Sequence, residues 1–505
     1  MRKNGVRFVW VGSGYEPESD FFYSSWIKSQ IVYSDLEKDI FIFEETIDLS
    51  PFFDLADVFF LSSRLDPFPN IAIDAVCSGV PVIAFDRVTG FSEFINAHPE
   101  VGAVVPPLDV NAAADAICDY LTGERVRYNT NSDIIKLFSF SSYADFVWQE
   151  CQTAIKMQQE IDEESKIITQ AKFMDIEFYK SGYPNWQTDL SPEYIYVALW
   201  RRGIPTSKSR IGFNDRIADS FDLNKTETNS TPLGRVLKSR GSPLTHNTLY
   251  VDFKRPREQW SGKLSVAIHI HAYYIDNLVS ALSRLRSLGQ YVLFFINTNT
   301  DEKAQDIRKI VDSFAFNAEI EVVTNRGRDI GPFIMAMKKH LPRFDIVCHF
   351  HFKGSKHLEQ AIVRQWQDFI FNTLIGHQGE ILNELLCAFE KNAKLGLLFP
   401  EDPSLPSWTK NFSYGQELID KLEIKRELPK EVDFPIGNMF IARSAALKQL
   451  MDYDWQWNDF MAEPIPEDGT ILHVIERITP AVCEVAGYEW ATVHNPAAKR
   501  YIHKN

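Results

Sequence analysis

The strongest constraint on the fold of this chain is an alternation of short apolar runs with helical patterns. The runs 7-RFVWVG-12, 57-DVFFLSS-63 and 80-VPVIAF-85 are rich in β-branched and aromatic residues and have the length of strands. Segments with a helical pattern, such as 110–121, follow them. Apolar strands that alternate with helices are typical of βαβ units, in which helices cover both faces of a parallel sheet. The sequence therefore predicts an α/β fold.

The same alternation returns in a second block near the C-terminus, with strands predicted at 264–271, 291–297, 319–324 and 344–350. A chain of 505 residues is too long for one hydrophobic core, so we expect separate domains. The predicted domains are an α/β domain at 1–155, a helical linker at 156–260 and a second α/β domain at 261–505.

The predicted linker begins with a charged helix and continues with short aromatic and turn-rich pieces. It contains two degenerate copies of one pattern, 173–207 and 213–245. Each copy leads from an aromatic start through a helix that contains proline to an Arg-Gly pair and a further proline. These copies resemble short helical repeats that lie beside the modules of bacterial polysaccharide glycosyltransferases. The alternative is a structured linker without a repeat.

Composition excludes several classes of function. The net charge is -15, whereas proteins that bind nucleic acid generally carry a basic surface, so no nucleic-acid partner is expected. The six cysteines are scattered without a Cys-x-x-Cys pair, which indicates reduced thiols and a cytoplasmic location. No apolar run reaches the roughly 18 residues that cross a bilayer. Peripheral contact with the inner face of the plasma membrane stays open, through the basic segments 201–210 and 235–240.

The first block carries a candidate nucleotide site in 62-SSRLDPFPNIAIDAVCSGVPVIAFD-86. A predicted strand ends near Ser62, and a loop that contains Asp66 leads into a helix near Ile71. The free amides at the start of a helix suit a diphosphate, and a nearby carboxylate suits ribose hydroxyls. Asp66, Asn70 and Asp74 are therefore the candidate donor-binding residues of this block.

The spacing of Asp66 and Asp74 resembles the E-x7-E motif of GT-B glycosyltransferases, with aspartate in place of both glutamates. The segments 67-PFPN-70, 79-GVPVIA-84 and 88-VTGFSEFI-95 also fit this family. The resemblance implies the Rossmann-like donor-binding half of a GT-B enzyme. The N-terminal acceptor lobe and the preceding strand and helix of that family are not seen, and aspartate shortens both carboxylate arms. We therefore expect a half module that does not catalyse by itself.

The second block places polar residues where its predicted strands end. His269 and His271 end the first strand; Asn325, Arg326, Arg328 and Asp329 follow the third; His349, His351, Lys353 and Lys356 end or follow the fourth. Side chains alternate along a strand, so the histidines of each His-x-His pair face the same way. If the first and fourth strands are neighbours, four imidazoles meet in one pocket.

Three interpretations of this histidine group compete. One is a divalent metal site at His349 and His351, because imidazole suits zinc and similar ions. Another is metal-free donor binding, in which Arg326, Arg328 and the two lysines neutralise a diphosphate. The third is a polar core in which the histidines satisfy one another. Metal-free donor binding is favoured, because basic residues crowd these strand ends and carboxylates are scarce there.

The motifs of this block together resemble the rhamnan synthesis protein F family. They are His-x-His-x-Tyr-Tyr from 269, 325-NRGRDIGPF-333, His-x-His-x-Lys from 349, 434-FPIGNMF-440 and 467-EDGT-470. The order of the strands resembles that of GT-A glycosyltransferases, which carry Asp-x-Asp where this chain has His-x-His. The resemblance implies transfer of a deoxysugar, with rhamnose from a dTDP donor as the first candidate, onto a lipid-linked glycan.

The resemblance also implies roles for residues near the C-terminus. Asp468 corresponds to the general base that accepts the proton of the acceptor hydroxyl, and Glu467 is the second candidate. The simpler alternative is that 467-EDGT-470 only begins a helix, where the dipole favours carboxylates. Gly437 and Asn438 lie where the acceptor loop of the family is expected.

The predicted function is therefore a glycosyltransferase of bacterial cell-surface polysaccharide synthesis that uses a nucleotide-sugar donor. Two alternatives stay open. One is a non-catalytic carbohydrate-binding or scaffold protein, which the Asp66 and Asp74 replacements and the missing Asp-x-Asp favour. The other is a transferase for a group such as a polyol phosphate. The sugar, the linkage and the oligomeric state do not follow from the sequence.

Overall fold

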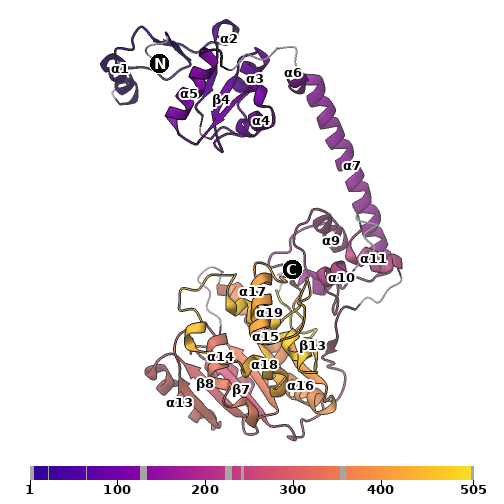
Figure 1. Cartoon of the computed structure of the whole chain (residues 1–505). Helices are drawn as coiled ribbons and strands as arrows, with labels where there is room; N and C mark the ends of the chain where they lie inside the picture. The colour runs from indigo at the N-terminus through magenta and orange to yellow at the C-terminus, as the bar shows by residue number, and fades with distance from the viewer. Residues whose placement is uncertain are drawn as a thin grey trace. The chain divides into compact units, whose positions relative to one another are not determined.

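The computed structural model in Figure 1 describes residues 5–20, 22–63, 65–124, 133–221, 230–239, 244–352 and 360–501. The chain divides into two compact units, Met1–Lys156 and Met157–Asn505. The boundary falls within the long helix α7 (Phe140–Ala171). None of the helices in the described ranges combines the length and apolarity that crossing a membrane requires.

The first unit contains parallel strands and short helices. Its strands are β1 (Phe8–Val11), β2 (Ile40–Phe43), β3 (Phe59–Leu61), β4 (Val82–Phe85) and β5 (Gly102–Val105). Its helices are α1 (Tyr23–Tyr33), α2 (Ser50–Leu55), α3 (Asn70–Cys77), α4 (Phe91–Ala97), α5 (Val110–Leu121) and α6 (Asp133–Leu137). β1 pairs with β2 in one sheet, and β3, β4 and β5 form another in that order.

Strand β4 shows why the apolar runs of this unit become central strands. All four of its residues are buried. Val82 and Ala84 pack with α3 and α4, while Ile83 and Phe85 pack with α5 on the opposite face. Because alternate residues point to opposite faces, a strand covered by helices on both sides must be apolar throughout.

The second unit is built on an eight-stranded sheet with the order β6-β13-β11-β12-β10-β7-β8-β9. Its strands are β6 (Thr248–Tyr250), β7 (Val266–His271), β8 (Leu293–Thr298), β9 (Ala318–Val322), β10 (Ile346–His351), β11 (Leu395–Pro400), β12 (Phe440–Arg443) and β13 (Glu489–His494). β12 runs antiparallel to both of its neighbours, and the other pairs are parallel. The predicted α/β fold class is confirmed.

Helices cover both faces of this sheet, so the unit has three layers. Its helices are α8 (Ile176–Lys180), α9 (Pro192–Arg201), α10 (Asp215–Phe221), α11 (Pro232–Ser239), α12 (Leu278–Arg284), α13 (Asp301–Phe314), α14 (Ile330–Met337), α15 (Gln360–Leu374), α16 (Glu380–Lys391), α17 (Phe412–Lys421), α18 (Lys448–Met451) and α19 (Ile471–Val485). On one face, α12, α13, α15 and α16 share a core with Ile268 and Cys348. On the other face, α14 and α17 to α19 share a core with Ala267 and Val347.

The segment predicted as a linker lies in the same compact unit as the C-terminal sheet. Tyr179 from the first predicted copy and Phe213 and Leu233 from the second pack into one small core with the end of α7. β6, which follows the second copy, is the edge strand of the large sheet and pairs with β13.

A buried ionic cluster anchors this segment to the sheet. The ammonium of Lys208 lies 2.6 Å from a carboxylate oxygen of Asp433 and 3.1 Å from one of Glu401, and the three side chains are 5% exposed or less. His246 lies 2.8 Å from the second oxygen of Glu401. Burial acts to raise the pKa of Glu401, but Lys208 and His246 outweigh it and hold that pKa well below its usual range.

We expect Lys208→Met to lower the free energy of unfolding of this unit by about 3–5 kcal/mol, because it leaves two buried carboxylates without their cation. The measurement is urea denaturation followed by tryptophan fluorescence. Lys309→Met is the matched control, since Lys309 pairs with Asp306 on the surface, where solvent screening leaves an ion pair with little effect on stability. Equal losses in the two variants would contradict the anchoring role of Lys208.

Candidate functional site

The carboxyl ends of β7 and β10 form the point where the chain reverses its direction across the sheet. From β7 the chain continues to β8 and β9 on one side, and then returns to place β10 on the other side of β7. In open α/β sheets, ligands bind outside the carboxyl ends of the strands at such a switch point. The topology therefore indicates a ligand site at the same edge of the sheet where the sequence places the histidine motifs.

The structure brings the four histidines of the two motifs together. β7 and β10 are parallel neighbours, with His269 opposite His349 and His271 opposite His351. His269 and His349 are completely buried, and His271 and His351 are 6% and 7% exposed. The rings of His269 and His349 contact the ring of Phe333 from α14.

A continuous chain of hydrogen bonds connects these rings. Nδ1 of His271 lies 2.6 Å from Oδ1 of Asn297, whose amide nitrogen lies 2.8 Å from Nε2 of His269 and 3.2 Å from the carbonyl oxygen of Pro332. Nδ1 of His269 lies 2.9 Å from Nδ1 of His349. Nε2 of His349 lies 3.5 Å from Oδ2 of Asp329, at the long limit for such a bond.

The donor and acceptor of each hydrogen bond in this series determine which nitrogen of each histidine ring carries the proton. The carbonyl of Pro332 can only accept, so the Asn297 nitrogen must point toward it and its oxygen toward His271. His271 therefore donates from Nδ1, and a neutral His269 accepts at Nε2 and donates from Nδ1. His349 then accepts at Nδ1 and donates from Nε2 to Asp329.

Two ring nitrogens in this group stay open. His351 donates from Nε2 to the carbonyl oxygen of Gly437 at 2.7 Å. Within the described ranges, neither Nε2 of His271 nor Nδ1 of His351 has a hydrogen-bond partner. In the neutral rings these two nitrogens carry lone pairs, so they accept hydrogen bonds. They suit a sugar hydroxyl or a metal ion, whereas a phosphate oxygen would require protonated imidazole.

Burial keeps the deepest rings neutral. It lowers the pKa of His271 to about 4, and it lowers the pKa of His349 and, much further, that of His269. Burial acts to raise the pKa of Asp329, but the His351 and His349 rings and the amide of Asn438 outweigh it and hold that pKa well below its usual range. The site therefore presents one fixed carboxylate, and the buried rings of His269, His271 and His349 are neutral at neutral pH.

The predicted acceptor residues belong to the same group. The side-chain amide of Asn438 donates to Oδ2 of Asp329 at 3.0 Å. Gly437 accepts from His351 and donates its own N–H to Glu476 of α19 at 2.5 Å. Gly437 has φ +81°, and a Cβ there would lie 2.1 Å from a ring carbon of Trp366. Glycine is therefore required twice, for the backbone conformation and for space.

The predicted basic residues are directed mainly at the loop that precedes α19. Nε of Arg326 donates to the carbonyl oxygen of Phe460 at 2.8 Å, and Arg328 donates to that of Ile465 at 3.0 Å. The terminal nitrogens of Arg326 have no partner in the described parts of the chain, so they can bind an anion. Asn325, which precedes Arg326 in the sequence, is exposed. Lys353 and Lys356 lie outside the described residues.

Asp468 lies in a separate hydrogen-bond group. Thr409 donates to its Oδ2 at 2.7 Å, and the amide of Asn411 donates to its Oδ1 at 2.6 Å. Burial acts to raise the pKa of Asp468, but the bonds from Asn411 and Thr409 lower it to about 2. Glu467 is exposed. Since an efficient base has a pKa near the working pH, the base role of Asp468 requires that substrate binding release these bonds, and it stays a prediction.

Helix α19 connects the two groups. It begins after the N-cap residue Thr470, so Glu467 and Asp468 precede the helix instead of lying in its first turn. Glu476 of this helix binds the N–H of Gly437, and the neighbouring Arg477 donates to the carbonyl oxygen of Ser407, two residues before Thr409. A shift of α19 would therefore move both groups.

The candidate residues of the first unit lie as the sequence analysis expects. Asp66 is in the loop before α3, Asn70 begins that helix, and Asp74 lies within it on an exposed position. The loop of Pro67 approaches Gly90, whose N–H donates to the Pro67 carbonyl at 2.7 Å. The structure thus joins the 67–70 and 88–95 segments, and a donor-binding role for the two aspartates stays a prediction.

Within the described ranges, the metal interpretation has donors of the right chemical type, but only two open ring nitrogens among the four histidines. A zinc site commonly takes four ligands, and imidazole nitrogens are among the preferred ones. Across the described ranges, no group of three or more His, Cys, Asp or Glu side chains is arranged to hold a metal ion. The two open nitrogens alone do not form such a site.

Sequence reasoning missed Asn297, Thr409, Asn411 and Glu476. Asn297 lies in 297-NTNTDE-302, and a buried amide where a strand ends next to a His-x-His strand is a signal that could have found it. The other three lack a local signal. They meet Asp468 and Gly437 only through the packing of 405–412 and α19 against the same face of the sheet.

With this geometry in place, comparison with known families is direct. Residues 242–487 match the family model described as rhamnan synthesis protein F. Residues 1–123 match the model described as glycosyl transferases group 1. The prediction that the chain joins these two kinds of module is confirmed. The two family descriptions support a glycosyltransferase that takes part in polysaccharide synthesis.

Curated relatives match only part of the chain. The uncharacterized protein WxcX of Xanthomonas campestris pv. campestris strain B100 is 29% identical over 233 residues, which are 45% of this chain and 33% of that protein. An exopolysaccharide phosphotransferase of Streptomyces coelicolor is 46% identical over 52 residues, 10% of this chain and 5% of that protein. The match thus spans about a third of the length of WxcX.

Solved structures give weak overall matches. A sucrose-phosphate synthase from Thermosynechococcus elongatus is 27% identical, with 29% of this chain and 38% of that chain covered and a TM-score of 0.25. Glucosyl-3-phosphoglycerate synthase from Mycobacterium tuberculosis, solved with uridine diphosphate, is 12% identical, with 52% and 79% covered and a TM-score of 0.23.

We expect Gly437→Ala to destabilise the protein more than Gly487→Ala. Both glycines have positive φ, but a Cβ at Gly487 meets nothing within 4 Å. The strain of a left-handed backbone should cost about 1–2 kcal/mol in each variant. The clash with Trp366 should add about 1–3 kcal/mol at Gly437 alone. Urea denaturation of both variants measures the difference, and equal losses would contradict the close packing seen here.

The stability of the second unit should fall as the pH falls from about 6.5 toward 4. A histidine in the unfolded chain takes up a proton near pH 6.5, whereas folded His271 does so only near pH 4. Within that window, neutral His271 therefore lowers the free energy of unfolding by about 1.4 kcal/mol for each pH unit that the pH falls, and above about pH 6.5 it has no such effect. Denaturation at several pH values should show a shallower fall for His271→Gln, and an unchanged fall for the exposed His377→Gln. Equal slopes would contradict the neutral assignment of His271.

Proposed function

We propose that the second unit transfers a sugar from a nucleotide-sugar donor to a growing cell-surface glycan. The observation that carries the proposal is the histidine, Asp329 and Asn438 group at the switch point of the sheet, where α/β proteins bind ligands. Rhamnose from a dTDP donor and a lipid-linked acceptor are the specific candidates, and the match to rhamnan synthesis protein F supports them. The proposed location is the cytoplasm, with peripheral contact at the membrane.

In the proposed reaction, the oxygen of an acceptor hydroxyl attacks the anomeric carbon of the donor sugar. The bond from that carbon to the diphosphate breaks, and its electron pair leaves with the diphosphate. We assign stabilisation of this negative charge to the terminal guanidinium nitrogens of Arg326, which have no partner in the described ranges, with Arg328 as the second candidate. The hydroxyl proton goes to Asp468, or to Glu467 as the alternative.

The histidines have a different proposed role. The open nitrogens of His271 and His351 accept hydrogen bonds from hydroxyls of the donor sugar. Asp329 fixes the orientation of both His349 and Asn438, so it maintains the shape of this subsite. In this assignment the rings select the sugar, and the arginines hold the diphosphate.

A second candidate function is transfer of a sugar phosphate or polyol phosphate. The observation that favours it is the 46% identity over 52 residues with the exopolysaccharide phosphotransferase. In that case the acceptor would gain a phosphate group together with the transferred unit. A non-catalytic carbohydrate-binding or scaffold protein is the third candidate, and it predicts no product from any donor.

The test is nucleotide release from a panel of nucleotide sugars that includes dTDP-rhamnose, with a rhamnosyl lipid acceptor, with and without chelator. We expect acceptor-dependent release that persists with chelator and that falls at least about 100-fold in Asp468→Asn, because general base catalysis contributes roughly that much or more. Asp306→Asn, on the exposed face of α13, is the matched control and should retain wild-type activity.

Mass spectrometry of the product separates the candidates. A glycan extended by one sugar supports the glycosyltransferase, and an added phosphate group supports the second candidate. Loss of activity with chelator would assign the open histidine nitrogens to a metal. No product from any donor would overturn the enzymatic proposal.

A further inference from the structure

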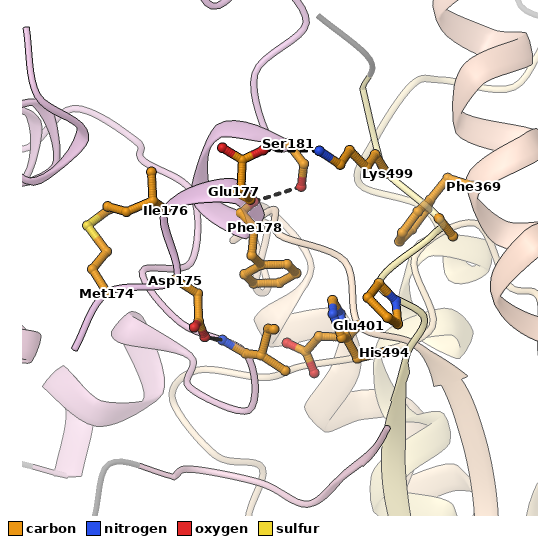
Figure 2. A pocket seen from close by; sticks show the side chains of 13 residues that line it. Met174, Asp175, Ile176, Glu177, Phe178, Ser181, Phe369, Glu401, His494 and Lys499 are labelled. Atoms are coloured by element: carbon orange, nitrogen blue, oxygen red, sulfur yellow. Dashed lines mark hydrogen bonds and ion pairs between the residues drawn. The ribbon is translucent and has the colours of Figure 1, made fainter. Parts of the chain in front are cut away.

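The described part of the second unit contains a cavity of about 370 Å³ (Figure 2), and none of the four histidines lines it. This volume lies within the range of roughly 300–1,000 Å³ that is usual for small-molecule sites. The cavity is lined by Met174, Asp175, Ile176, Glu177, Phe178, Ser181, Ile211, Phe369, Glu401, His494, Pro496, Ala498 and Lys499. Neither family match nor the proposed reaction assigns it a role.

The cavity opens at the same edge of the sheet as the histidine group. Its floor includes Glu401, which follows β11, and His494, which ends β13. β11 and β10 are both antiparallel to β12, so their carboxyl ends lie on the same side. The opposite wall is α8 with Asp175 before it, which the Lys208 cluster holds against the sheet.

His494 gives this cavity a polar group that the protein leaves free. Within the described residues, neither of its ring nitrogens has a hydrogen-bond partner. Burial lowers its pKa, so the ring is neutral at pH 7 and offers one donor and one acceptor. The rings of Phe178 and Tyr250 pack against it with centroids 5.8 Å and 5.7 Å away, which fixes its orientation.

The charges around the cavity disfavour an anionic ligand. Three carboxylates line it, from Asp175, Glu177 and Glu401, but Glu401 already pairs with the buried Lys208, and the one ammonium in the described lining is that of Lys499. That ammonium is already 3.0 Å from Glu177 on the surface. A phosphate or nucleotide would therefore meet the carboxylate of Asp175 and no unpaired ammonium in the described lining, whereas a hydroxyl group can donate to a carboxylate without desolvating a charge of its own.

The remaining walls are apolar. Phe178, Phe369, Ile176 and Ile211 present carbon surface beside Asp175 and His494. A pyranose ring has the matching character, since its C–H groups pack on apolar walls while its hydroxyls bond to a few convergent polar groups. Sites for small molecules commonly combine an apolar lining with a few such groups.

We propose that this cavity binds an uncharged saccharide unit of the acceptor glycan. The proposal rests on the proposed function, because it supplies a second contact for the same polymer at the same edge of the sheet. His494 and Asp175 hydrogen-bond the hydroxyls of the unit, and Phe178 packs against its ring. A glycan held here stays on the enzyme between transfers, which raises its effective concentration at the histidine group.

The test is binding of an uncharged rhamnose trisaccharide to the full chain without any donor, measured by calorimetry. Hydrogen exchange in the presence of the trisaccharide locates the site without a variant, and we expect protection in 174–181 and 494–499. His494→Ala and Asp175→Asn should each weaken binding about tenfold, since losing a hydrogen bond costs roughly 0.5–1.5 kcal/mol and 1.4 kcal/mol is a factor of ten.

His377→Ala is the matched control, because His377 is exposed and does not line the cavity, and its affinity should equal that of the wild type. The absence of binding, protection elsewhere only, or unchanged affinity in both cavity variants would overturn the proposal. Because no donor is present, these outcomes are independent of whether the protein transfers a sugar. A protein that binds the trisaccharide here but transfers nothing would contradict the proposed function alone.

Discussion

The parallel pairing of β7 with β10 is the constraint on which the site depends. It places His269 beside His349 and His271 beside His351, although 80 residues separate each pair. It also creates the reversal of strand order that leaves an opening at the carboxyl edge of the sheet. A shift of one of these strands by one residue would turn its two rings toward the apolar core on the opposite face and separate them from the other pair.

Once paired, the histidines are held by a buried polar network. Burying these polar groups costs little free energy, because the ring nitrogens of His269 and His349 all have hydrogen-bond partners. Each ring nitrogen of His269 and His349 has a partner, and Asn297 supplies the donor and acceptor that orient the chain. A half-satisfied network of this kind would be costly at low dielectric constant. Within the described ranges, the two nitrogens that stay open, on His271 and His351, are therefore the groups of this network that can still accept a hydrogen bond.

A second buried network attaches the segment 157–260 to the large sheet. Lys208 joins the segment 157–260 to Glu401 and Asp433, and in doing so it places α8 over the ends of β11 and β13. The cavity that results shares an edge of the sheet with the histidine group. A segment that was predicted as a linker thus builds one wall of this cavity.

The sequence by itself determined the elements and the composition of the site. The strands predicted in the second block match β7 to β10 with ends that differ by two residues or fewer, because apolar runs covered by helices leave a clear local pattern. The side chains His271, Asp329, His351 and Gly437 were identified from motifs. Only the tertiary structure decided their partners, such as Asn297 for His271, Thr409 for Asp468 and Glu401 for Lys208. Those partners are distant in sequence, and hydrogen bonds and ion pairs between them depend on packing that no local pattern records.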